Sequence, residues 1–415
     1  MSATRWLIFS TIAIVLCPSA AGFAADPPED ADWLSYFHRR DVSSHIGRTG
    51  DQHLQPTSRA PAGVKVPDDF GQAVRYVKWS TPMDPNGFRH AAFASSHGVL
   101  LDRLLVDRNG DGRLADETAI VAHHVQTYGG GRGRSCFGPV PMRLPGDDGP
   151  IIYHLSFSAA RWGPNSIRIS AAAACWYEGA VRVDGRARPC QLIDYNANGS
   201  FNDVCDEQLN RGSADRIRLS SRPADHHEPL FDQKHFVGAY VRLGDRFYSV
   251  TAARDGAYLA LRPAKDLKTV SLNLPDALHG VVIYGPQGRF EVQSHDDRHP
   301  APPGRYRFEA WQCEATDSGG RQWHFMGRYF PADSAFDLSA DVSGPIDIDI
   351  GPPLVASVDR RMVRGGHYFR QALRGRLGEH VSVDSLSGRR RPPAPRLRIV
   401  NSDGSYDRTF QFEYG

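Results

Sequence analysis

The sequence predicts an all-β protein: several antiparallel sandwich or hairpin-repeat modules that follow a signal peptide and a disordered linker. After about residue 70 the chain consists of short β-type runs, such as Ile151–Phe157 and Ser166–Ser170, broken by Gly, Asp, Asn and Pro. No stretch after the first 25 residues shows the long amphipathic periodicity of a helix. With 415 residues, the chain is long enough for two to four domains.

Residues 1–25 have the features of a secretory signal peptide. Arg5 gives a short positive region, Trp6–Cys17 is an apolar run too short to span a bilayer, and Ser19–Gly22 offers small residues for cleavage. An uncleaved N-terminal anchor is the alternative. We therefore expect the mature protein to be secreted, periplasmic or attached to the cell surface.

The rest of the chain is predicted to divide into four parts. Residues 26–69 lack periodicity and are rich in Pro, Ser, Asp and His, so we expect a largely disordered linker with one short helix at Ala31–His38. Residues 70–270 are predicted to form a β domain and residues 271–352 a β-sandwich module. Residues 353–415 form a C-terminal β module, either a small sandwich or a continuation of the previous one.

A ten-residue pattern of Asp, Asn and Gly occurs twice in the predicted β domain. Both copies have oxygen-bearing side chains at positions 1, 3, 5 and 10, Gly at position 6 and a large apolar residue at position 8. Oxygen ligands at every second residue of a tight curve suit a hard divalent cation, above all Ca²⁺. The predicted ligands are Asp107, Asn109, Asp111, the carbonyl of Arg113 and Asp116 in the first loop, and Asp194, Asn196, Asn198, the carbonyl of Ser200 and Asp203 in the second.

The two loops resemble the calcium loops of EF-hand and dockerin proteins. The resemblance fails at position 12, where those families have an acidic residue and this chain has Thr118 and Cys205. The flanking segments predict strands, so an EF-hand sensor that opens on binding is not expected. The second loop, with two Asn, should bind more weakly, and two metal-free turns are the alternative. Asp116 or Glu117 in the first loop, and Asp203 or Asp206 in the second, could substitute for the missing acid.

Two further segments support the β prediction. Tyr248–Leu261 has the same outline around Gly256 but lacks the ligands, which indicates a repeated hairpin unit. Residues 280–312 combine a strand, a Pro-Gly corner and the Tyr306–Phe308 pair. This segment resembles the carboxypeptidase-regulatory and transthyretin-like β-sandwich modules, and the resemblance implies a fold but no activity.

Five cysteines follow the signal peptide, and export permits disulfide bonds between them. A bridge between Cys190 and Cys205 would close a short loop around the second motif and add about 3 kcal/mol of stability. Cys136 with Cys175 is a second candidate pair, which leaves Cys313 unpaired. Five buried free thiols are the alternative.

Charge and motifs exclude several functions. The formal net charge is +2, and loss of Arg5 with the signal peptide leaves +1, so the charge does not favour nucleic-acid binding. No other apolar run is long enough to span a membrane. Motifs of serine hydrolases, zinc proteases and phosphate loops are missing from the sequence. We expect a calcium-binding β protein with a structural or binding role and an extracellular glycan or protein partner. The alternatives are a secreted hydrolase with structural calcium and a carbohydrate-binding module.

Overall fold

The computed structural model describes residues 27–146, 149–163, 166–219, 234–293, 300–341, 344–363, 365–385 and 393–413. The predicted signal peptide lies outside these ranges. Within them the chain is almost entirely β, with antiparallel sheets apart from the parallel pair β19–β26, so the predicted all-β class is confirmed. None of the described helices is long and apolar enough to cross a membrane.

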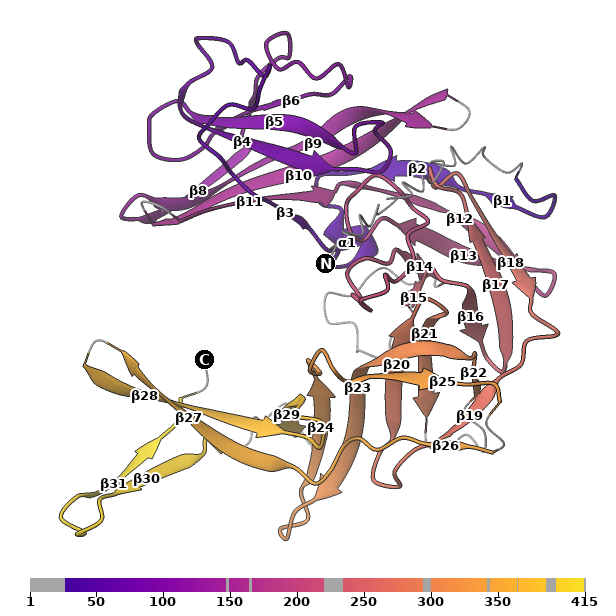
Figure 1. The fold of residues 1–415 in the computed structure, drawn as a ribbon, viewed down its shortest axis with the longest axis vertical. Coiled ribbons are helices and arrows are strands. Elements are labelled where there is room, and N and C mark those ends of the chain that lie inside the picture. The colour runs from indigo at the N-terminus through magenta and orange to yellow at the C-terminus, as the bar shows by residue number, and fades with distance from the viewer. Residues whose placement is uncertain are drawn as a thin grey trace, which may run out of the picture.

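Four antiparallel sheets succeed one another along the first two thirds of the chain (Figure 1). The first contains β4 (Gln72–Ser80), β5 (Phe88–Ser95), β6 (Arg103–Val106) and β7 (Ile120–Val121). The second contains β8 (His124–Gly129), β9 (Arg132–Gly146), β10 (Gly149–Gly163) and β11 (Ser166–Ala173). The third contains β12 (Cys175–Val183), β13 (Arg186–Ile193), β14 (Arg216–Arg218) and β15 (Lys234–Phe236). The fourth contains β16 (Tyr240–Leu243), β17 (Arg246–Ala252) and β18 (Tyr258–Pro263).

The N-terminal segment corrects two predictions. Residues 27–69 are not a disordered linker, and Ala31–His38 is not a helix, because short strands of this segment complete three of the sheets: β1 pairs with β18, β2 with β12 and β3 with β11. Each strand is too short to show periodicity in the sequence, and burial of Leu34, Ile46 and Leu54 fixes them to the core. The elements are β1 (Asp32–Trp33), β2 (Ser35–His38), the one-turn helix α1 (Ser43–Ile46) and β3 (Gln52–Leu54).

The main hydrophobic core lies between these sheets. In β5, Ala91 and Phe93 belong to the main core, whereas the alternate residues Ala92 and Ala94 pack on the opposite face under Phe70. Both faces of the strand are buried, because successive side chains point to opposite sides of a sheet. This double burial explains the unbroken apolar run Ala91–Ala94 within β5.

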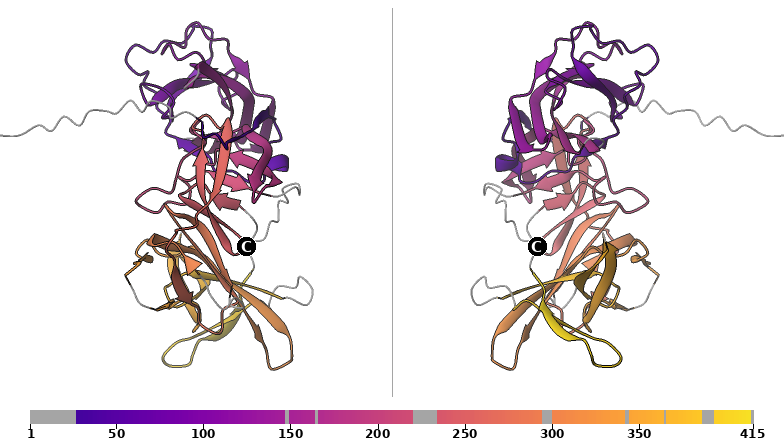
Figure 2. Two further views of the ribbon diagram at one scale, coloured as in Figure 1. Left: turned by 90° about the vertical axis from the view of Figure 1, so that its right-hand side faces the viewer. Right: turned by 90° about the vertical axis from the view of Figure 1, so that its left-hand side faces the viewer.

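The last third of the chain forms a second body with its own core around Trp311. Figure 2 shows its yellow C-terminal end opposite the indigo N-terminal sheets. A small sheet contains β22 (Pro300–Ala301), β19 (Val270–Asn273) and β26 (Ile346–Asp347). The large sheet contains β20 (Gly280–Gly285), β21 (Gly288–Gln293), β23 (Gly304–Thr316), β24 (Gln322–Arg328), β25 (Ala335–Leu338), β27 (Val355–Val363), β28 (Gly366–Arg374) and β29 (His380–Ser385). β30 (Arg396–Val400) and β31 (Asp407–Gln411) form a separate hairpin.

The strands expected in residues 280–312 are present. β20 pairs with both β21 and β23, and Tyr306 is fully buried, with its hydroxyl donating to the carbonyl of Pro302 at 2.8 Å. The relationship to transthyretin-like modules stays a prediction. The His-rich segments 225–228 and 294–299, for which the sequence favours solvated loops over a transition-metal site, lie outside the described residues.

The predicted disulfides are wrong, because all five cysteines between residues 27 and 415 are free. Cys190 packs in the main core, whereas Cys205 packs in a separate cluster with Leu209 and Phe236, so the two thiols face different interiors. The alternative of five free thiols holds, with Cys136 half-buried and the other four buried.

Thiol chemistry provides a first test. We expect an excess of reducing agent to leave the melting temperature unchanged, since no bridge among the described residues is lost. In the native protein Cys136 should react first with a thiol reagent, because burial raises the pKa of Cys175 and Cys190 to about 12 and shields both sulfurs. A melting temperature that falls on reduction would contradict the free thiols.

Candidate metal centre

Both Asp/Asn loops connect paired antiparallel strands, as predicted. The first loop joins β6 to β7, and the second joins β13 to β14. The third segment with this outline forms the β17–β18 hairpin, where the Asp255 carboxylate accepts the backbone N–H of Ala257 at 3.0 Å. The local pattern therefore specifies a strand–loop–strand unit in all three places.

The two loops share one hydrogen-bond network. At position 1, the Asp107 carboxylate accepts the N–H groups of Gly110 (2.8 Å) and Gly112 (3.0 Å). The Asp194 carboxylate likewise accepts the N–H groups of Ala197 (2.6 Å) and Gly199 (2.7 Å). In both loops, the side-chain oxygen at position 3 also accepts the backbone N–H of position 5. The side-chain oxygen at position 5 accepts the backbone N–H of position 7. Side-chain bonds to the backbone two to five residues ahead fix this curve, which is why the pattern recurs with the same shape.

Two positions of each loop require left-handed backbone. At position 6 the φ angles are +79° for Gly112 and +89° for Gly199. At position 4, Gly110 has φ +84°, and a Cβ there would lie 2.7 Å from the guanidinium of Arg89. The second loop has Ala197 at position 4 with φ +57°, a conformation that costs a non-glycine residue about 1 kcal/mol.

The first loop has carboxylates with free acceptor capacity. Asp107 is 3% exposed, and each of its oxygens accepts one loop N–H, which leaves a lone pair on each. Burial raises the pKa of Asp107, whereas the N–H of Arg113 lowers the pKa of the exposed Asp111. The exposed side chain of Asp116 interacts with Asp111. The solvent side of the loop is therefore rich in negative charge.

A buried ion pair supports the first loop from below. Arg89 is 2% exposed, and its Nε donates to Asp84 at 3.0 Å. Its Nη1 donates to the carbonyl of Arg108 at 2.8 Å and to that of Asp107 at 3.4 Å. The guanidinium thus holds two loop carbonyls in place.

The second loop is satisfied internally. Asp194 is fully buried, and besides the loop N–H groups it accepts the hydroxyl of Tyr153 at 2.7 Å and the N–H of Asn198 at 3.3 Å. All four lone pairs of the carboxylate are therefore in use. The side-chain amides of Asn196 and Asn198 donate to Asp203 at 2.9 and 2.6 Å, so amide donors already neutralise the carboxylate at position 10.

Asp215 is a neighbour of the second loop that the sequence pattern did not reveal. It is fully buried and accepts the N–H groups of Tyr195 and Asp203, each at 2.9 Å. Burial raises the pKa of Asp215, and the charges of Asp194 and Asp203 raise it further. Burial likewise raises the pKa of Asp194 to about 7.

The structure brings the predicted ligands together only in part. Within the described ranges, no three His, Cys, Asp or Glu side chains are arranged to hold a metal ion. Calcium would therefore need the oxygen of Asn109 and the carbonyl of Arg113 besides the carboxylates of the first loop. Glu117, the candidate nearest to position 12, is already paired with a cation: its two oxygens accept the N–H and the guanidinium of Arg108, both at 2.7 Å, so calcium would have to compete with this ion pair.

The apolar residues at position 8 anchor both loops, as predicted. Leu114 is 0% exposed and packs in the small outer core with Phe70, and Phe201 is 1% exposed and packs in the main core. The backbone N–H of Phe201 also donates to the carbonyl of Arg254, at 2.9 Å, in the turn of the third hairpin.

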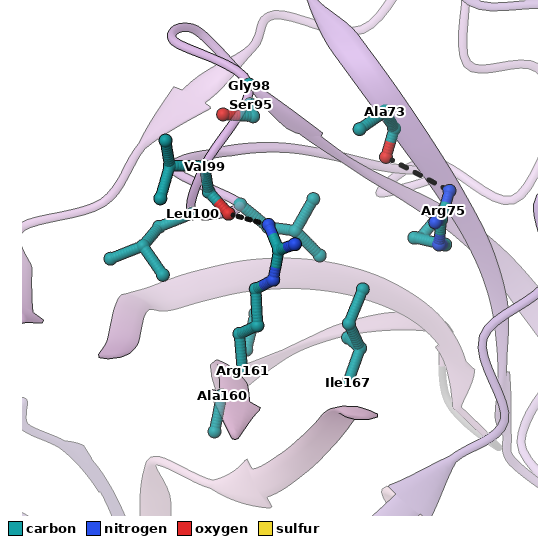
Figure 3. Close-up of a pocket in the computed structure, with 11 residues that line it drawn as sticks. Ala73, Arg75, Ser95, Gly98, Val99, Leu100, Ala160, Arg161 and Ile167 are labelled. Atoms are coloured by element: carbon teal, nitrogen blue, oxygen red, sulfur yellow. Dashed lines mark hydrogen bonds between the residues drawn. The ribbon is translucent and has the colours of Figure 1, made fainter. Parts of the chain in front are cut away.

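A small cavity between the first two sheets offers no reactive group. It measures about 130 Å³ and contains the side chains of Arg75 and Arg161 (Figure 3). Both guanidiniums donate to backbone carbonyls, Arg161 to that of Val99 at 2.6 Å and Arg75 to that of Val74 at 3.0 Å. The space is smaller than a typical ligand site. Among the described residues no carboxylate lines it, so the cavity lacks the paired carboxylates used for glycoside hydrolysis.

Comparison with protein families, with curated proteins and with solved structures found no match.

Proposed function

We propose that this is an exported β protein with a structural or binding role, and that its Asp107–Asp116 loop binds Ca²⁺. The observation that supports the proposal is the first loop itself: an exposed curve of oxygen-bearing side chains whose buried Asp107 keeps a lone pair on each oxygen. Calcium would be held by Asp107, Asn109, Asp111, Asp116 and the carbonyl of Arg113.

The second loop is proposed as a metal-free version of the same turn. Ligation by Asp194 would require loss of a hydrogen bond from Tyr153 or from the loop. The amides that donate to Asp203 would have to turn away. We therefore expect one calcium ion per chain.

Calcium binding to the folded state alone should stabilise the protein by mass action. Extracellular modules bind with dissociation constants of about 0.1–1 mM, so a calcium concentration of about 10 mM should add about 1.4–2.7 kcal/mol. If the chain of 415 residues unfolds as one unit, the melting temperature should rise by about 2–3 °C relative to chelator. Differential scanning calorimetry measures the shift, and calorimetric titration measures the stoichiometry.

A matched pair of variants separates ligation from turn stability. Asp111→Ala should abolish the calcium shift. Asp403→Ala should keep it, because Asp403 is also exposed, precedes a Gly and accepts the N–H two residues ahead at 2.9 Å, but lies in the β30–β31 turn. A wild-type protein that melts at the same temperature in calcium and in chelator would refute the calcium site.

A further inference from the structure

The C-terminal hairpins project from the second body with little core of their own. β28 is joined to β29 through the single pair Arg374 and His380, and β30–β31 pairs with no other strand among the described residues. Large apolar side chains stay exposed on them, including Tyr368 at 60% and Phe410 at 43%. An isolated two-stranded hairpin is at best marginally stable in water, so these hairpins fit a surface that gains stability from a partner.

A groove of about 600 Å³ lies between the two hairpins, which Figure 1 shows side by side at the lower end of the molecule. This volume is in the range of ligand sites. Leu397 and Ile399 of β30 line one wall. The aromatic part of the lining comes from Tyr368, Phe369, Tyr406, Phe410 and Phe412.

The polar side chains that line the groove can donate hydrogen bonds, and none of the described lining residues has a carboxylate. The polar lining residues are Arg360, His367 and Gln411. Arg360 is exposed on β27, opposite Phe369 in the register of β27 and β28. The groove therefore presents a guanidinium beside aromatic rings, a combination that suits an occupant with both carboxylates and apolar faces.

The charge of the chain is divided between its two ends. Residues 353–415 contain twelve Arg, no Lys and six Asp or Glu, a surplus of six positive charges. Because the whole chain has +2, residues 1–352 have a surplus of four negative charges. A second copy that docked its own C-terminal hairpins on this face would bring like charge to it, which disfavours a symmetric dimer here and favours an anionic partner.

We propose that this groove binds an acidic polysaccharide, with sugar rings packed on the aromatic side chains and a uronate carboxylate paired with Arg360. The C–H faces of a pyranose ring are apolar and match aromatic faces, whereas the carboxylate matches a guanidinium. A peptide that adds a strand uses the backbone edge of a sheet, but here strand side chains form the walls. The inference deepens the proposed binding role and does not depend on calcium.

The test is binding of an oligogalacturonate to the full mature chain, measured by titration calorimetry in chelator at physiological salt. Chelator keeps calcium from gelling the sugar, so failure here is distinct from failure of the calcium site. We expect saturable binding of one oligomer and no binding of a neutral maltooligosaccharide of equal length. Arg360→Gln should weaken binding about tenfold or more, and Phe410→Ala severalfold.

Arg361→Gln is the matched control, because it removes the same charge from the same strand. Arg361 is the exposed neighbour of Arg360 and is not part of the groove lining. Arg361→Gln should change the affinity by less than about twofold. Equal weakening by the two arginine variants would show a diffuse charge effect and overturn the groove. Tighter binding of a polyglutamate peptide than of the oligogalacturonate would overturn the proposed ligand class.

Discussion

Replacing Asp194 by Ala is expected to lower the free energy of unfolding by about 3–5 kcal/mol at pH 5. The substitution leaves the hydroxyl of Tyr153 and the N–H groups of Ala197 and Gly199 buried without their acceptor. Each unsatisfied buried donor costs about 1–3 kcal/mol. Urea unfolding followed by tryptophan fluorescence measures the loss.

The loss of stability caused by Asp194→Ala should be smaller at pH 8 than at pH 5, because the pKa of Asp194 is raised in the folded state. Burial raises the pKa of Asp194 to about 7, above the value of 3.8 for an unperturbed carboxyl. Between these values the folded state binds more protons than the unfolded state, so this group makes wild-type stability fall as pH rises from about 4 to 7. Ala has no such dependence, so the difference between the proteins narrows.

Tyr153→Phe should show the opposite trend with pH. The substitution removes one hydrogen-bond donor from Asp194. A hydrogen bond to an ionised carboxylate stabilises the folded state by about 1.5–3 kcal/mol, whereas a hydrogen bond to a neutral carboxyl stabilises it by about 0.5–1.5 kcal/mol. The loss should therefore be larger at pH 8 than at pH 5. Tyr248→Phe is the control, because the Tyr248 hydroxyl donates at 2.6 Å to Asp184, whose side chain is 43% exposed. If Tyr153→Phe had the same cost at both pH values, Asp194 would not titrate as described.

Local information explains which features the sequence could predict. The conformation of both Asp/Asn loops depends on side-chain bonds to residues two to five positions ahead, and the positions of Leu114 and Phe201 follow from the same curve. The alternating β runs likewise depend on neighbours in the chain. These features were predicted because their physical causes lie within about ten residues.

Contacts between distant segments explain the failures. The strands of residues 27–69 are two to four residues long and pair with strands more than 100 residues away, such as β1 with β18. The spacing of Cys190 and Cys205 permits a bridge, but the sheet directs the two thiols to different cores. Arg89, Tyr153 and Asp215 meet the loops only through the fold, so no pattern around Asp107 or Asp194 could have revealed them.

Replacing Arg89 by Met is expected to lower the free energy of unfolding by about 3–5 kcal/mol, because it leaves Asp84 as an uncompensated buried carboxylate. The change also removes the donor that holds the carbonyl of Arg108 under the first loop. Arg103→Met is the control on the adjacent strand: within the described part of the chain, Arg103 donates to the backbone carbonyls of Asp69 at 3.2 Å and Phe70 at 3.3 Å. Arg103→Met should lower the free energy of unfolding by no more than about 1 kcal/mol.

A double-mutant cycle identifies the cause of the Arg89 effect. Asp84→Asn combined with Arg89→Met removes both charges, so the double variant should lose less stability than the sum of the single variants, by about 1–3 kcal/mol. Strict additivity would mean that the two side chains do not act as a pair. The buried guanidinium would then support the loop through its hydrogen bonds to the carbonyls of Asp107 and Arg108, and Arg89→Gln, which keeps a donor, should lose less stability than Arg89→Met.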